Sequence, residues 1–238
     1  MKLLLDAGNT RLKWRRLADD DSLLEENSTL LADLGGLSAL WQAWPFTYAV
    51  GCDVAGEAVA AAIAAVLASG CDLTWLVPTA EMAGVKNSYL PPHRLGADRW
   101  AALIAAAAYP QSARIIVCAG TALTIDALTP DNRFLGGTIS PGFSLMRASL
   151  AESTALLTAE HGEYHPLPRQ TEDAIHSGCI NALTAPIARM VTHLEAQFDA
   201  VTVILTGGDA RLIGSHLPVS HRIVDNLALD GLARISRL

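Results

Sequence analysis

Short apolar runs that end in turn-forming residues recur along the chain and predict buried strands. Residues 3–5 form the first such run, and a turn of small and polar residues follows at once. A run of this kind is typical of a buried strand that leads into a tight turn. The same pattern predicts further strands at residues 73–77, 114–118, 123–128, 134–139 and 201–205.

Other segments have the composition or the spacing of helices. Residues 55–69 are rich in alanine and leucine, which favour helix formation. Residues 96–108 carry apolar side chains at helical spacing, and residues 172–197 form a third helical segment. Because the predicted strands alternate with helices, the pattern indicates an α/β architecture.

The chain also contains an internal similarity. Residues 4–9 (LLDAGN) align with residues 116–121 (IVCAGT), almost half a chain length later. Each copy is an apolar strand, then a turn of small residues, then a segment with the pattern of a second strand. The similarity favours a duplication into residues 1–110 and 111–238, in which two similar halves place both glycine turns at one central cleft.

The composition mainly excludes classes of protein. The 238 residues are 51% hydrophobic and 17% charged, which is enough apolar material for a sizeable core. A net charge of −7 provides no field that attracts nucleic acid or an anionic membrane. The apolar run at the N-terminus and the alanine-rich stretch at residues 55–67 are too short for a signal peptide or a membrane span. Without CxxC spacing, we expect reduced thiols in a cytoplasmic protein at Cys52, Cys71, Cys118 and Cys179.

Residues 6–13 combine the groups that hold a nucleotide phosphate. Gly8 permits close backbone approach, and Asn9 and Thr10 add side-chain donors to the turn amides. Asp6 can hold Mg²⁺ through water, and Lys13 can reach the phosphates. The same segment also fits an ordinary hairpin turn. The chain has neither the GxxxxGK[ST] phosphate loop nor the GxGxxG dinucleotide motif.

A second polar segment leads into the helix predicted at residues 96–108. Asp98 lies near its N-terminus and can accept a proton from a hydroxyl nucleophile, and Arg99 can pair with a carboxylate. The alternative is that Asp98 caps the helix and Arg99 is its surface partner. Thr121 and Thr171 present hydroxyls at two further turns, each of which is also compatible with a purely structural role.

Together these segments resemble the type III pantothenate kinase family over nearly the whole chain. The longest shared motif is NxYxxPxxLGxDRW at residues 87–100. The others are DxGNTxxK at residues 6–13, AGTAxTxD at 119–126, GGxIxPG at 136–142, the helix start at Thr171, and TGGD at 206–209.

The resemblance implies two RNase H-like halves of the actin-like ATPase fold around a central cleft, in a homodimer. It implies ATP- and Mg²⁺-dependent phosphorylation of pantothenate to 4'-phosphopantothenate, the first step of coenzyme A synthesis, with Asp98 as the general base. The implied substrate-binding residues are Tyr89, Gly96, Ala97, Arg99 and Thr171. The implied ATP-binding residues are Asp6, Ala7, Gly8, Asn9, Thr10, Arg11, Leu12, Lys13 and Thr121, with Asp6 also serving Mg²⁺.

The chain departs from the family at Cys118, where many members carry an aspartate that binds an activating monovalent cation. A neutral thiol is a poor ligand for K⁺ or NH₄⁺, so we expect this cation site to be weakened or altered. Two other functions fit the superfamily: a small-molecule kinase that acts on a different acceptor, and a nucleotide-binding regulatory protein.

Overall fold

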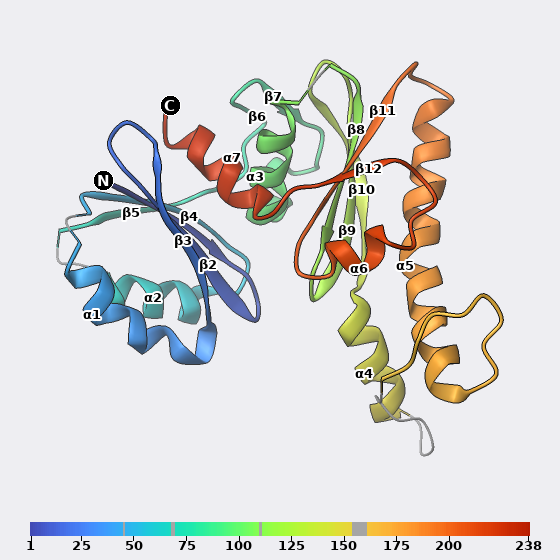
Figure 1. Ribbon diagram of the computed structural model, residues 1–238. Coiled ribbons are helices and arrows are strands. Elements are labelled where there is room, and N and C mark those ends of the chain that lie inside the picture. The colour runs from blue at the N-terminus through green and yellow to red at the C-terminus, as the bar shows by residue number, and fades with distance from the viewer. Residues whose placement is uncertain (45, 68–69, 110, 154–160) are drawn as a thin grey trace. The chain divides into compact units, whose positions relative to one another are not determined.

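The structure is a computed structural model that describes residues 1–44, 46–67, 70–109, 111–153 and 161–238. The chain forms two compact units (Figure 1). Unit 1 comprises Met1–Pro110, Asn132–Phe134 and Asn226–Leu238; unit 2 comprises Gln111–Asp131 and Leu135–Asp225. The sequence pattern assigned all of residues 111–238 to the second half, whereas the last segment packs within unit 1.

A five-stranded sheet with strand order β3-β2-β1-β4-β5 forms the centre of unit 1. β1, β2 and β3 pair in an antiparallel manner, while β4 and β5 extend the sheet in parallel with β1. The strands span Lys2–Ala7 (β1), Arg11–Leu17 (β2), Leu23–Leu30 (β3), Tyr48–Asp53 (β4) and Asp72–Trp75 (β5).

Alternation along the strands divides the apolar side chains of unit 1 between the two faces of this sheet. Leu3 and Leu5 pack in one core with Trp41 of α1 and Ile63 of α2. Arg15 of β2, on the opposite face, reaches Asp230 of α7 at 2.7 Å. The helices of unit 1 are η1 (Leu31–Gly36), α1 (Leu37–Gln42), α2 (Glu57–Val66), η2 (Pro92–Arg94), α3 (Ala97–Ala106) and α7 (Leu227–Ile235).

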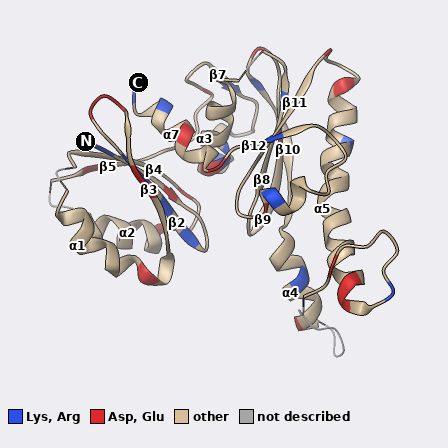
Figure 2. Ribbon diagram, viewed as in Figure 1, with Lys and Arg blue, Asp and Glu red and all other residues tan. Residues whose placement is uncertain are grey.

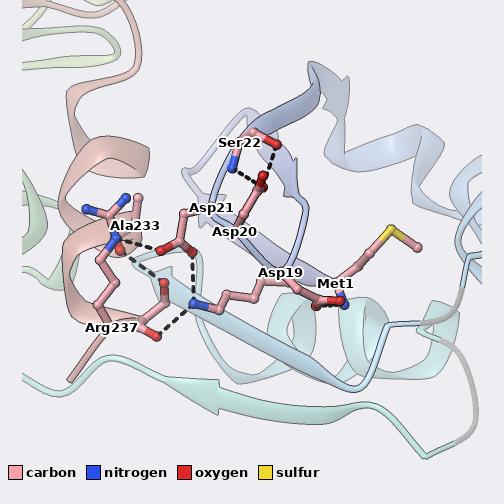
Figure 3. A network of polar contacts seen from close by, with 9 residues as sticks. Met1, Asp19, Asp20, Asp21, Ser22, Ala233 and Arg237 are labelled. Carbon is pink, nitrogen blue, oxygen red and sulfur yellow. Dashed lines mark hydrogen bonds and ion pairs between the residues drawn. The ribbon is translucent and has the colours of Figure 1, made fainter.

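Helix α7 belongs to unit 1 because it packs against α3 at very close range. A Cβ atom at Gly231 would lie 1.9 Å from the carbonyl oxygen of Ala101, so only glycine permits this approach. Polar contacts hold the end of α7 as well (Figure 3). Asp21 accepts hydrogen bonds from Arg237 Nε and Lys2 Nζ, both at 2.9 Å, which joins the β2–β3 turn, β1 and the C-terminal residues.

Opposite charges line up across β2 and β3 (Figure 2). Arg15 pairs with Glu26 at 2.5 Å and Arg16 pairs with Glu25 at 3.5 Å. Unit 1 also contains the hairpin of β6 (Glu81–Met82) and β7 (Val85–Asn87). β7 pairs in parallel with Arg133 and Phe134, the first part of β10 that belongs to unit 1.

Unit 2 repeats the topology of unit 1. Its strand order β10-β9-β8-β11-β12 corresponds to β3-β2-β1-β4-β5, again with an antiparallel β8–β9 pair and parallel pairing of β11 with β8 and β12. The strands span Ala113–Ala119 (β8), Ala122–Leu128 (β9), Arg133–Pro141 (β10), Val201–Thr206 (β11) and His221–Ile223 (β12). The helices are α4 (Phe143–Ser153), α5 (Thr171–Glu195) and α6 (Ala210–Gly214). The α/β architecture predicted from the sequence is confirmed.

Most predicted elements lie within two residues of the observed ones. The helix predicted at residues 55–69 is α2 over Glu57–Val66, and residues 68 and 69 lie outside the described part of the chain. The pattern did not assign the strands β3, β4, β6, β7 and β12 or the α-helices α1, α4, α6 and α7. Among the helices that the structure describes, none combines the length and hydropathy needed to cross a bilayer.

Candidate functional site

Three side chains form a row across neighbouring strands of unit 1. Asp6 on β1 is the register partner of Lys13 on β2 and of Cys52 on β4. Register partners point to the same face of a sheet, so all three lie on the face that α3 and α7 cover. The thiol of Cys52 donates a hydrogen bond to Asp6 Oδ1 at 3.3 Å. The row thus brings a carboxylate, an ammonium group and a thiol together.

Asp98 adds a second carboxylate to this face from the first turn of α3. Its Oδ1 accepts a hydrogen bond from the backbone N–H of Arg99 at 2.7 Å. A Cβ atom at Gly96, just before the helix, would lie 2.7 Å from Asp98 Oδ1. Glycine at this position therefore leaves space for the carboxylate. The LGxDRW segment therefore combines a helix start with room for the Asp98 carboxylate.

The surroundings of Asp6 and Asp98 raise the pKa of both carboxyl groups above the values that these groups have in water. Burial raises the pKa of Asp98, although the backbone hydrogen bond and the charge of Arg99 act in the opposite direction. Burial also raises the pKa of Asp6; Lys13 opposes this shift and Asp98 adds to it. Burial, followed by the negative charges of Asp6 and Asp98, holds the pKa of Cys52 well above its usual range. Cys52 is therefore a neutral thiol.

The turn after β1 exposes backbone and side-chain donors. The N–H of Gly8 bonds to the carbonyl of Arg11 at 3.1 Å, and Asn9 and Thr10 are exposed at its tip. Ala7 and Leu12 are fully buried in the unit 1 core, so only their backbone groups are available to a ligand. The exposed Arg11 side chain is hydrogen-bonded to Ser28 at 2.9 Å.

Arg99 is only 4% exposed and lies against two aromatic rings of unit 1. Its guanidinium carbon is 5.9 Å from the ring centroid of Tyr89 and 6.0 Å from that of Phe134. The two rings stack, with centroids 6.3 Å apart and planes 15° apart. The Asn87 side chain braces this loop, since its Nδ2 donates to the carbonyls of Thr79 and Pro92 and its Oδ1 accepts from the N–H of Tyr89.

Several of the glycine motifs of unit 2 meet at the turn between β8 and β9. The exposed Thr121 lies at this turn, and its carbonyl accepts a hydrogen bond from the N–H of Gly142 at 2.8 Å. Gly207, with φ of 99°, lies so close to Ala119 that a Cβ would be 2.2 Å from the Ala119 carbonyl oxygen. A Cβ atom at Gly142 would lie 1.9 Å from the carbonyl oxygen of Gly120, so the shape of this turn depends on glycine at both Gly142 and Gly207.

A second row in unit 2 corresponds to the row in unit 1. Cys118 on β8 is the register partner of Thr124 on β9 and of Thr206 on β11. All three side chains are neutral, in contrast to the charged row of unit 1. Thr171 is exposed in the first turn of α5.

A model of the type III pantothenate kinase family matches residues 2–193. A type III pantothenate kinase of Laribacter hongkongensis is 46% identical over 100% of this chain and 99% of its own length. One of Dechloromonas aromatica is 42% identical, with 99% of each chain covered. The chain belongs to the type III pantothenate kinase family.

Solved structures share the fold of this family member at low sequence identity. A Campylobacter jejuni protein described as a Baf family transcriptional activator has a TM-score of 0.64 at 19% identity, covering 99% of this chain and 97% of its own. The activator of 2-hydroxyisocaproyl-CoA dehydratase from Clostridium difficile, solved with bound ADPNP, has a TM-score of 0.51 at 11% identity, covering 98% and 92%. These likenesses concern the fold alone.

Within this type III pantothenate kinase family member, the sequence motifs did not single out Phe134 or Cys52. Phe134 is fully buried, and its place in an apolar segment predicts only a core residue. Its contact with Tyr89 becomes visible only with the pairing of β10 and β7. Cys52 lies in no motif. Its position at the end of an apolar run, residues 48–52, is typical of a strand end, but only the pairing of β4 with β1 places it beside Asp6.

Proposed function

We propose that this protein uses ATP to phosphorylate pantothenate to 4'-phosphopantothenate, the first step of coenzyme A synthesis. Membership of the family supports this activity, and so does the convergence of Asp6, Lys13 and Asp98 on one face of unit 1. That convergence is the observation that carries the proposal. Phosphoryl transfer requires positioned charges around the phosphates and a group that accepts the hydroxyl proton.

Asp98 is the proposed general base. In its ionised form it takes the proton of the pantothenate hydroxyl as the oxygen attacks the γ-phosphorus, and the bond to the β,γ-bridging oxygen breaks. The raised pKa of Asp98 makes it a stronger base than a fully hydrated carboxylate. The backbone hydrogen bond from Arg99 holds one oxygen, Oδ1, so that the carboxylate keeps its orientation.

Asp6 and Lys13 are proposed to act on the phosphates of ATP. Mg²⁺, when bound with ATP, neutralises part of the phosphate charge; it typically takes one or two carboxylates and several waters. A carboxylate at Asp6 fits such a role through a water molecule, and Lys13 fits a direct contact with a phosphate oxygen. Asn9 and Thr10 at the tip of the turn are proposed to supply further donors, whereas the N–H of Gly8 is already bonded to the carbonyl of Arg11 and Gly8 contributes its lack of a side chain. The role of Thr121 stays a prediction from the sequence.

Arg99 is proposed to bind the pantothenate carboxylate. The two stacked rings limit the motion of the guanidinium and shield it from water, which strengthens its pairing with an anion. Tyr89 supplies one of these rings, and Gly96 and Ala97 form the backbone beside it. The contact of Thr171 with pantothenate stays a prediction from the sequence.

The monovalent cation site is proposed to be weakened in this chain. Cys118 stands where many members of the family have an aspartate, and its register partners are Thr124 and Thr206. Hydroxyl oxygens can bind K⁺, but this row has no carboxylate to offset the charge of the ion.

A homodimer is also part of the proposal. The middle of α5 carries few charges (Figure 2), and its exposed positions include Ala174, Gly178, Ala182 and Ala185. Small side chains at this spacing allow a second helix to approach closely. Light scattering after gel filtration should give the mass of a dimer, and Ala182→Glu should shift it toward that of the monomer.

A cytoplasmic location completes the proposal. Cys52, Cys71, Cys118 and Cys179 form no disulfide, which fits a reducing compartment.

The decisive experiment measures ADP release from MgATP with and without pantothenate, in K⁺ and in Na⁺ buffers of equal ionic strength. Pantothenate-dependent release, with a phosphorylated product detected by mass spectrometry, is the expected result. If folded protein binds ATP but does not turn over pantothenate in either buffer, the proposal is refuted. A panel of other hydroxy acids and sugars then tests for a different acceptor.

A further inference from the structure

The Cys52 thiol occupies a place where a purely apolar side chain would be expected. It is 1% exposed on β4, a strand whose residues Ala49 and Val50 are buried apolar groups. Its hydrogen bond nevertheless goes to the carboxylate of Asp6 rather than to the backbone. A buried polar atom aimed at a carboxylate constrains that carboxylate.

The hydrogen bond distinguishes the two oxygens of Asp6. Oδ1 accepts from Cys52 Sγ at 3.3 Å, and within the described parts of the chain no hydrogen bond reaches Oδ2. Lys13 lies on the other side of Asp6 in the same row. The carboxylate is therefore held at one oxygen between two neighbouring strands, and the other oxygen is left for a ligand.

We propose that Cys52 is a positioning residue, whose thiol fixes Asp6 Oδ1 so that Oδ2 is presented to the hydrated Mg²⁺ of ATP. The inference rests on the proposed function in one respect, the assignment of Asp6 to Mg²⁺. Cys52 itself contacts neither the nucleotide nor the metal. The competing explanation is that Cys52 only fills space, in which case its removal affects stability and nothing else.

The two explanations predict different effects of substitutions on Mg²⁺-dependent nucleotide binding. Cys52→Ser keeps a donor of similar size, whereas Cys52→Ala removes the donor and leaves a small cavity. Cys179→Ala is a matched control, since Cys179 is also buried, at 5% exposure, but lies in the apolar core of unit 2. Asp6→Asn reports on the role of Asp6 itself.

The measurement is calorimetric binding of a non-hydrolysable ATP analogue to the full-length protein, with Mg²⁺ and with EDTA. Mg²⁺ should strengthen binding to the wild type, and Cys52→Ala should reduce this gain about 3- to 10-fold, as expected for the loss of one modest hydrogen bond. Binding in EDTA should be nearly unchanged. Cys52→Ser and Cys179→Ala should keep the wild-type gain, even if thermal unfolding shows that Cys179→Ala is destabilised.

Two results would overturn the inference. One is a full Mg²⁺ gain in Cys52→Ala while Asp6→Asn loses it, which would leave Cys52 as a space-filling residue. The other is a full Mg²⁺ gain in Asp6→Asn, which would remove Asp6 from the metal site. Failure of the proposed activity is seen separately, as absence of pantothenate-dependent ADP release by the wild type, because the binding comparison needs no turnover.

Discussion

Replacing Asp98 by asparagine should abolish most of the turnover while leaving the fold intact. Asparagine retains an oxygen that can accept the hydrogen bond from the Arg99 N–H, at present 2.7 Å from Asp98 Oδ1. It cannot take a proton from the substrate hydroxyl. General-base catalysis typically contributes about 10²–10⁴-fold. Because phosphoryl transfer passes through a loose transition state, we expect a loss in kcat in the lower part of this range, about 10²–10³-fold.

The same substitution should stabilise the protein at neutral pH. Burial raises the pKa of Asp98 above its value in the unfolded chain, so the folded state holds this proton more tightly. Its contribution to the free energy of unfolding therefore falls as pH rises from the unfolded pKa through the folded pKa. Above that window the wild type retains a buried charge that asparagine lacks. The stability gain of Asp98→Asn should shrink as pH is lowered through the folded pKa.

The assay pairs steady-state ADP release with urea unfolding at several pH values from about 4 to 8. Asp98→Ala is the control, because it removes both the base and the oxygen that accepts from Arg99, so it should lose activity without the same gain in stability. Wild-type turnover by Asp98→Asn would remove Asp98 from the mechanism. A stability difference that does not change with pH would refute the argument from burial.

Three further predictions concern other parts of the molecule. Arg99→Lys should raise the KM for pantothenate about 10- to 100-fold with a smaller effect on the KM for ATP, because lysine cannot form the two-pronged contact with a carboxylate; steady-state kinetics with each substrate varied checks this. Gly231→Ala should destabilise the protein by about 1–3 kcal/mol through overpacking against Ala101, measured by urea unfolding, whereas Gly35→Ala, which has no atom within 4 Å of the new Cβ, should not. The ratio of turnover in K⁺ and Na⁺ should stay below about twofold, because a thiol at Cys118 is a poor ligand for K⁺ and its register partners Thr124 and Thr206 carry no charge; a large stimulation by K⁺ at constant ionic strength would contradict this.

The sequence pattern predicted well those strands and helices whose signal lies within their own residues. β1 and β8 are apolar runs bounded by turns, and α3 and α5 are long enough to show helical spacing. α7 is only one residue shorter than α3, but Gly231 in its middle lowers its helix propensity, and the pattern did not assign it. Its close packing on α3, which makes glycine necessary there, becomes visible only in the folded unit.

The candidate site likewise contains residues that the sequence predicts and residues that only the folded structure brings together. Asp98 and Arg99 stand next to each other in a long motif, so their shared helix start could be predicted from spacing. The contact of Arg99 with Phe134 could not, because it depends on the parallel pairing of two short segments that lie far apart in the sequence. Cys52 was likewise outside any motif, and its relation to Asp6 follows from the register of β4 with β1.

The repeated topology shows why similar halves need not share chemistry. Aligning residues 4–9 with residues 116–121 places Cys118 at the position of Asp6, and strand register then places Thr206 at the position of Cys52. The backbone arrangement is the same, but the row in unit 2 contains neither a carboxylate nor an ammonium group. Asp6 and Lys13 are the side chains proposed to act on Mg²⁺ and the phosphates, so of the two rows only the one in unit 1 carries charged groups for that role. A Cys118→Asp variant should therefore strengthen binding of a monovalent cation to unit 2 without creating a second Mg²⁺ site, since Thr124 stands where unit 1 has Lys13.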